Sequence, residues 1–153
     1  MPELTLPAEG GCRCGRLRFR LTERPLMTMA CHCRGCQRMS ASAFSLTAMF
    51  PKAAFAVTAG EPVIGGLHDP EQRHHHCDWC KSWVFTAADA ASGFINVRAT
   101  LLDDPAWFRP FLETMTAAKL PWVELPVRHS FAGLPPPDRY AALMEEFAAL
   151  AAG

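Results

Sequence analysis

The stretch Cys31-His32-Cys33-Arg34-Gly35-Cys36-Gln37 places three thiols within six residues. The chain has seven cysteines, and the other four form two further close pairs, Cys12 with Cys14 and Cys77 with Cys80. The first residues, MPELTLPAEGG, contain neither a basic region nor an apolar run. We therefore expect no secretory signal and a cytoplasmic protein. In a reducing compartment, an odd number of clustered cysteines indicates metal or redox chemistry rather than structural disulfides.

The length and composition of the chain suit one soluble domain. It has 153 residues, of which 50% are apolar, and its formal net charge is zero. This balance favours neither a nucleic acid nor an anionic membrane surface as a partner. We expect no membrane association, because no apolar stretch approaches the length that crosses a bilayer. Three prolines, Pro135 to Pro137, predict a break between a domain of residues 1–134 and a helical extension of residues 135–153 packed on it.

Apolar and polar residues alternate in several segments, which predicts short β-strands with one buried face. Leu17, Phe19 and Leu21 alternate with arginines, for example. The predicted strands span residues 17–21, 44–50, 55–58, 83–86 and 94–99. After Asp138, the expected cap, apolar residues recur at helical spacing and predict a C-terminal helix whose apolar stripe packs on the core: Tyr140, Leu143, Met144, Phe147 and Leu150. The predicted architecture is therefore mainly antiparallel β with one C-terminal α-helix.

The spacing of the cysteines predicts two metal sites. Two thiolates in a C-x2-C turn can converge on one cation, and thiolates suit zinc. The simplest partition joins the two outer pairs into a closed four-sulfur site and keeps the middle triplet together as a three-sulfur site: Cys12, Cys14, Cys77 and Cys80; Cys31, Cys33 and Cys36. A closed site holds structure, whereas a three-ligand site keeps a position for water or an external thiol, as catalytic zinc sites do. We therefore expect two zinc ions per chain, one structural and one catalytic.

Other ligand sets and other chemistries remain open at this point. A fourth protein ligand would make the triplet structural as well, and the candidates are an acidic side chain or a histidine: His32, His68, His74, His75 and His76. His32 is poorly placed, because a residue between two that face a metal from an extended segment points away. The run His74 to His76 could instead be an exposed strand end. An iron-sulfur cluster lacks its dense cysteine run here, and thiol-disulfide chemistry at Cys77 to Cys80 lacks its βαβ context.

Taken together, these motifs are recognisable. They are Gly10-Gly11-Cys12-Arg13-Cys14-Gly15, the stretch Cys31 to Gln37, Phe44, and Cys77-Asp78-Trp79-Cys80, with Leu101 to Pro105 and Pro121-Trp122 further along. Over roughly residues 8 to 130 they resemble the glutathione-dependent formaldehyde-activating enzyme family, also called the centromere protein V type. The resemblance implies an Mss4-like fold of small antiparallel β-sheets around zinc. It also implies that the outer cysteine pairs form the structural site and the triplet forms the catalytic one.

The resemblance implies an activity as well. The family's named reaction condenses glutathione with formaldehyde to S-(hydroxymethyl)glutathione, which is carbon-sulfur lyase chemistry. We therefore expect a zinc-dependent enzyme with glutathione as co-substrate and a small thiol or aldehyde as its partner. Arg34 and Arg38, and also Arg18, are candidates to bind the carboxylates of glutathione, because a guanidinium fork fits a carboxylate. The alternative is a non-enzymatic zinc module that binds a protein or a small ligand, and a homodimer remains open.

Three positions depart from the family pattern. Lys81 stands where a glycine usually follows the last cysteine, and Ala41 stands where a glycine is expected after Ser40. Near Pro110 the family often has a histidine, where this chain reads Phe111-Leu112-Glu113. We expect the first two departures to alter turn geometry or ligand access without abolishing zinc binding. The third leaves the identity of the substrate open.

Overall fold

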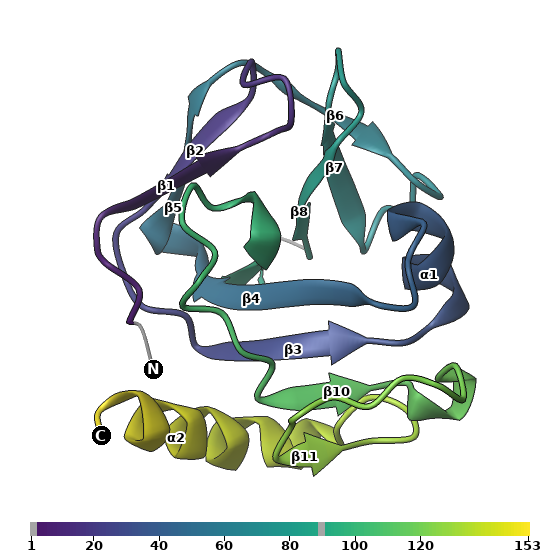
Figure 1. The fold of residues 1–153 in the computed structure, drawn as a ribbon. Coiled ribbons are helices and arrows are strands. Elements are labelled where there is room, and N and C mark those ends of the chain that lie inside the picture. Colours follow the sequence, from purple (N-terminus) through teal and green to yellow (C-terminus); the bar gives the residue numbers. More distant parts are fainter. Residues whose placement is uncertain (1–2, 89–90) are drawn as a thin grey trace. The chain divides into compact units, whose positions relative to one another are not determined.

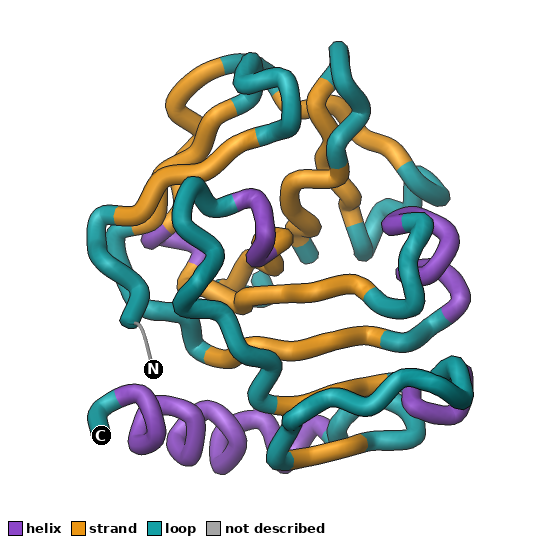
Figure 2. The backbone as a smooth tube through the Cα atoms, in the orientation of Figure 1, coloured by secondary structure: helices purple, strands orange, loops and turns teal. Residues whose placement is uncertain are grey.

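The computed structural model describes residues 3–88 and 91–153, and strands make up most of its regular structure (Figure 2). The chain forms two compact units. The first contains the residues up to Pro25 together with Met49–Phe108, and the second contains Leu26–Ala48 and Arg109–Gly153. Strand β4 (Ser45–Pro51) begins in the second unit and ends in the first. The predicted mainly β class with a C-terminal helix is confirmed.

The first unit contains a three-stranded antiparallel sheet in the order β1 (Ala8–Gly11), β2 (Arg18–Leu21) and β5 (Phe55–Ala59). Strand β2 has the predicted alternation, because Phe19 is buried while Arg20 is exposed to solvent. The loop between β1 and β2 carries the first cysteine pair. The antiparallel pairing on both sides of β2 therefore fixes the two ends of that loop.

Four further strands of the first unit form an antiparallel meander in chain order: β6 (Pro62–Gly65), β7 (Arg73–Cys77), β8 (Trp83–Ala87) and β9 (Phe94–Arg98). Short 3-10 turns lie at Lys52–Ala54 and Ala99–Leu101. Strands β8 and β9 match predicted segments, whereas β6 and β7 were not predicted. The turn between β7 and β8 carries the last cysteine pair.

The histidine run of β7 is half-buried, so its interpretation as an exposed strand end is wrong. The ring of His75 stacks on Phe85 of β8 with their centroids 4.4 Å apart. His74 Nδ1 lies 2.8 Å from the hydroxyl oxygen of Thr86. Burial lowers the pKa of all three histidines, because it disfavours the charged imidazolium. The side chains of His74 and His75 therefore belong to the packing between β7 and β8.

In the second unit, strands lie in the order β11 (His129–Ser130), β10 (Leu112–Thr114), β3 (Met27–Cys31) and β4. Figure 1 shows β3, β10 and β11 side by side. Strand β10 pairs in parallel with both β3 and β11, which adds parallel ladders to the antiparallel pairing that the sequence predicts. Helix α1 (Arg34–Ser40) follows β3 and was not predicted. A 3-10 turn at Thr116–Ala118 follows β10.

The predicted C-terminal helix is present as α2 (Tyr140–Ala151). Leu143 is buried and Phe147 packs edge-on against Phe111 with ring centroids 5.4 Å apart, so the apolar stripe serves packing as expected. The expected cap is wrong. Asp138 lies in a preceding 3-10 turn, Pro137–Arg139, and no side chain caps the first turn of α2. The division of the chain at residue 134 stays a prediction.

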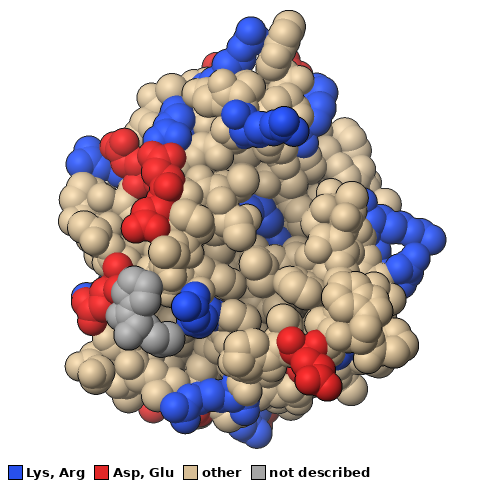
Figure 3. All heavy atoms as spheres, in the orientation of Figure 1, with Lys and Arg blue, Asp and Glu red and all other residues tan. Residues whose placement is uncertain are grey.

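Charged side chains are scattered over the face shown in Figure 3, where some blue and red groups touch and others are surrounded by uncharged surface. This dispersion accords with the zero net charge of the chain. In the part of the chain that the structure describes, no helix combines the length and the hydropathy needed to cross a bilayer.

Candidate metal centres

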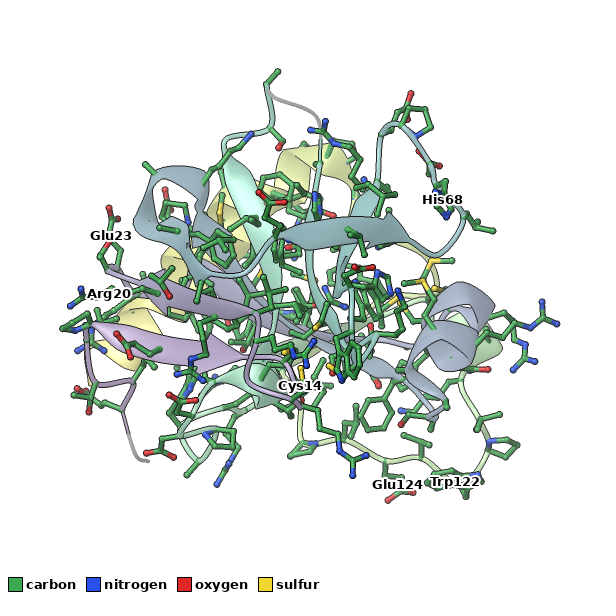
Figure 4. The ribbon with its side chains drawn as sticks, turned by 90° about the horizontal axis from the view of Figure 1, so that it is seen from above. Cys14, Arg20, Glu23, His68, Trp122 and Glu124 are labelled. Atoms are coloured by element: carbon green, nitrogen blue, oxygen red, sulfur yellow. The ribbon has the colours of Figure 1, made fainter. Side chains whose placement is uncertain are left out.

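Four thiols meet in the first unit. Cys12 and Cys14 lie in the loop between β1 and β2, Cys77 ends β7, and Cys80 lies in the turn before β8; Figure 4 labels Cys14. All four sulfurs lie within 4.8 Å of one another, with 3.5 Å between Cys12 and Cys14 and 3.7 Å between Cys14 and Cys77. Four sulfurs at about 2.3 Å from a tetrahedral zinc ion lie about 3.8 Å apart. The predicted group therefore fits zinc.

Two similar turns present these sulfurs. In the first, the N–H of Gly15 donates to the carbonyl oxygen of Cys12 at 3.1 Å, and the N–H of Leu17 donates to the Cys12 sulfur at 3.3 Å. In the second, the N–H of Lys81 donates to the carbonyl oxygen of Cys77 at 3.0 Å. Gly15 has a φ of +80° and Lys81 a φ of +59°. Because glycine alone adopts such values freely, the departure from the family at Lys81 places a side chain in a strained backbone conformation.

The thiols of this cluster differ in proton affinity. Burial raises the pKa of Cys80, but hydrogen bonds from Ser82 and from neighbouring cysteines outweigh it and lower the pKa to about 5. The backbone N–H of Arg16 lowers the pKa of Cys14, but the neighbouring thiols raise it, to about 11. The first thiolate to form opposes the ionisation of the next one, as expected for adjacent anions. A cation among the sulfurs would remove this opposition.

Three thiols meet in the second unit. Cys31 is the last residue of β3, Cys33 is the capping residue of α1, and Cys36 lies in the first turn of that helix. Their sulfurs lie within 4.8 Å of one another. The Cys33 sulfur accepts the backbone N–H of Cys36 at 3.2 Å, so it caps the helix in the way that a serine or aspartate oxygen does. The structure thus brings together the triplet that the spacing predicts.

A hydrogen bond between two of these thiols separates their pKa values. Cys36 donates to Cys31, and together with the Cys33 backbone and the Thr114 hydroxyl it lowers the pKa of Cys31 to about 5, against the effect of burial. The pKa of Cys36 is raised, first because it is the donor of that bond and then because it is buried. The Cys31 thiolate therefore forms readily, whereas ionisation of Cys36 needs a compensating positive charge.

In residues 3–88 and 91–153, the triplet gathers no histidine nitrogen or carboxylate oxygen as a fourth ligand. His32 turns away from it, as expected for a residue between two ligands. The ring of His32 is fully buried, its Nε2 lies 2.7 Å from Glu113 Oε2, and it meets Phe44 edge-on with centroids 5.6 Å apart. Three thiolates are a donor set that zinc accepts, so the triplet fits the metal.

The residues around His32 were missed in the sequence. Glu113 Oε1 accepts a hydrogen bond from Lys119 Nζ at 3.0 Å and another from Ser130 Oγ at 2.7 Å. Burial raises the pKa of Glu113, but Ser130, Lys119 and His32 together lower it below its ordinary value. Glu113 lies in the stretch where the family often has a histidine. No local signal links it to His32, because the two residues are 81 positions apart.

The candidate arginines are placed differently. Arg34 and Arg38 are both exposed on α1 and lie four residues apart, on one face of that helix, whereas Cys36, two residues from each, lies on another face. Arg34 also donates to the side-chain oxygen of Gln37. In the first unit, Arg18 is paired with Asp103 through two hydrogen bonds of 2.9 and 2.5 Å. Binding of a carboxylate by Arg34 or Arg38 stays a prediction.

Comparison with known proteins identifies the family. Residues 7–118 match the glutathione-dependent formaldehyde-activating enzyme family, and the chain therefore belongs to that family. No curated protein matches the chain. A structural-genomics crystal structure of a Rhodobacter sphaeroides protein is similar with a TM-score of 0.48 and 17% sequence identity, over 62% of this chain and 87% of that one. Membership confirms the resemblance read from the cysteine motifs and associates the chain with zinc- and glutathione-related chemistry.

Proposed function

We propose that this protein is a zinc-dependent enzyme of the carbon-sulfur lyase type that acts on adducts of glutathione or a similar thiol. Membership of the family supports a glutathione-related role. The observation that carries the proposal is the triplet itself, in which Cys31, Cys33 and Cys36 converge and the described residues add no fourth ligand. A site of this kind suits an external thiol as its fourth donor.

The proposed reaction joins a thiol to an aldehyde. The thiol sulfur forms a bond to the carbonyl carbon, the carbon-oxygen double bond becomes a single bond, and the thiol proton passes to the former carbonyl oxygen. Zinc held by the three cysteines would supply a Lewis acid that lowers the pKa of a thiol. The chain's own part is to hold that position at the start of α1, and the exposed Arg34 and Arg38 of the same helix are the candidates to bind the carboxylates of the tripeptide.

Cobalt substitution of the full chain tests this function. Glutathione should change the thiolate-to-cobalt absorption, because a fourth sulfur alters the ligand field. S-methylglutathione should produce no change, since it has no free thiol. Cys33→Ser should abolish the response while the near-ultraviolet circular dichroism of the zinc-loaded protein stays as in the wild type. If the assay responds, formaldehyde consumption in the presence of glutathione gives the second readout.

The alternative function has a distinct result in the same experiment. If neither glutathione nor another small thiol perturbs the cobalt spectrum, the enzyme proposal fails and a non-enzymatic zinc module is favoured. The same conclusion follows if the Cys33→Ser protein responds like the wild type, because the thiol then binds elsewhere.

A further inference from the structure

We infer that His32 is a positioning residue for the three-cysteine site, and that Glu113 holds it in place. The inference deepens the proposed function, on which it rests only in requiring that the triplet bind a metal. The supporting observation is that His32 lies between Cys31 and Cys33 and that hydrogen bonds fix both its backbone and its side chain. No sulfur of the triplet needs to touch Glu113 for this to hold.

The backbone of His32 is bonded on both sides. Its N–H donates to the carbonyl oxygen of Thr114 on β10 at 3.0 Å. Its carbonyl oxygen accepts the side-chain amide of Gln37 at 2.9 Å, and the same amide donates to the carbonyl oxygen of Ala118 at 3.0 Å. Both peptide groups that flank the Cα of His32, and thus the links to Cys31 and Cys33, are therefore tied to neighbouring elements.

The side chain of His32 is fixed more firmly still. Its Nε2 lies 2.7 Å from a carboxylate that is only 4% exposed, and that carboxylate is itself held by Lys119 and Ser130. His32 Nδ1 is buried without a hydrogen-bond partner among the described residues. The arrangement therefore favours the tautomer that carries its proton on Nε2 and donates it to Glu113. Three donors compensate the buried carboxylate, which would otherwise be costly.

The anchor acts on the sulfurs through the geometry of an extended chain. Successive side chains of such a segment point to opposite sides, so a ring fixed on one side directs the side chains of Cys31 and Cys33 to the other. Without the bond to Glu113 the segment could rotate, and the two sulfurs would no longer converge with that of Cys36. Loss of groups that orient metal ligands from outside typically costs about 10- to 100-fold in metal affinity.

The second unit provides a matched control. His129 Nε2 lies 2.8 Å from Glu146 Oε2, a histidine-glutamate pair of nearly the same length that joins β11 to α2. This pair is not part of the segment that carries the triplet. Glu146→Gln and Glu113→Gln therefore make the same chemical change, an amide for a carboxylate, at two His-Glu pairs of one unit.

The test measures metal retention in the full, zinc-loaded chain by competition with a chromophoric chelator, and the cobalt spectrum of each variant. Glu113→Gln should weaken retention at the triplet by about tenfold or more and shift its cobalt bands. The four-sulfur site should hold its metal as in the wild type. Glu146→Gln should change neither site. Unchanged triplet affinity and unchanged cobalt bands in Glu113→Gln would overturn the inference.

A second pair of variants separates positioning from plain stability. His32→Gln retains an amide that can donate to Glu113, whereas His32→Leu retains only bulk. The glutamine variant should keep most of the triplet's affinity and the leucine variant should lose it. If both behave alike, or if both metal sites weaken in parallel with the fold, His32 is structural only. Because no thiol is added, a wild-type protein that fails to respond to glutathione would leave this test intact.

Discussion

Lys81 takes the same left-handed backbone conformation after Cys80 that Gly15 takes after Cys14, with φ values of +59° and +80°. The two turns present paired sulfurs of one cluster. The N–H of Gly15 donates to the carbonyl oxygen of Cys12, and the N–H of Lys81 donates to that of Cys77. Glycine is suited to the position in both. The lysine therefore retains the turn at an energetic cost, which explains how the departure from the family leaves the geometry of the cluster intact.

Lys81→Gly should raise the free energy of unfolding by about 0.5–1 kcal/mol, because a left-handed residue other than glycine costs roughly this much. The side chain lost in this change makes an exposed ion pair with Asp78, which contributes little. Denaturant unfolding of the zinc-loaded protein measures the difference. Lys52→Gly is the control and should lower stability, since Lys52 is not among the residues with positive φ. A destabilised Lys81→Gly protein would contradict the strain argument.

Purified full-length protein should contain about two zinc ions per chain, as one four-thiolate and one three-thiolate site require. A chelator should remove the metal of the triplet first, because it has one protein thiolate fewer and an accessible fourth position. Elemental analysis before and after graded chelation measures both quantities. A single, tightly held zinc ion would rule out the two-site scheme.

Cys80→Ser should destabilise the protein by several kcal/mol more than Cys36→Ser. The four-sulfur site closes a long loop, since Cys14 and Cys77 are 63 positions apart, whereas the triplet spans six residues of one segment. Metal binding at the first site therefore contributes more to folding. Thermal unfolding of both variants with zinc present gives the comparison. Equal losses would indicate that both sites are structural.

Arg38→Gln should weaken glutathione binding by roughly tenfold, because a charged hydrogen bond to a carboxylate is lost. Arg34→Gln should have a smaller effect, since part of that side chain's hydrogen bonding is already directed at Gln37. Titration of the cobalt-substituted protein measures affinity. Arg20→Gln, an exposed arginine on β2, serves as the control, and the diethyl ester of glutathione should bind wild type and Arg38→Gln equally. Equal loss with the ester would remove Arg38 from the carboxylate site.

The hydrogen bonds from Arg18 lower the pKa of Asp103 below its ordinary value of 3.8. A carboxylate whose pKa is lower in the folded protein stabilises the fold above the pKa of the unfolded chain, and the contribution is lost as the pH falls through the folded value. Since the pair is partly exposed, its contribution is at most about 1 kcal/mol and declines in salt. Carboxyl NMR titration should show the depressed midpoint in the wild type and its return to normal in Arg18→Gln. A midpoint that stays unchanged in the variant would contradict the assignment.

The features that sequence predicted are those encoded locally. The period of two in residues 17–21 located β2, and the helical spacing after Asp138 located α2. The grouping of the cysteines followed from spacing alone, because every cysteine of the chain lies in a close pair or in the triplet. Their roles as structural or catalytic ligands stay predictions.

The features that sequence missed depend on partners distant in the chain or on unusual local chemistry. Helix α1 has seven residues and no apolar stripe, and its cap is the sulfur of Cys33 rather than one of the usual oxygens. The bond between His32 and Glu113 exists only because β3 and β10 pair in parallel. The cap expected at Asp138 failed because a 3-10 turn intervenes and shifts the helix start to Tyr140.

Gln37 uses both protons of one buried amide on two carbonyl oxygens, those of His32 and Ala118. The genetic code leaves this residue little room. A single base change that alters the amino acid of a glutamine codon yields glutamate, lysine, arginine, histidine, leucine, proline or a stop, and none of these carries a neutral amide with two donors. Every such substitution at position 37 therefore loses one or both of these hydrogen bonds. Relatives that retain this arrangement should show almost no variation there.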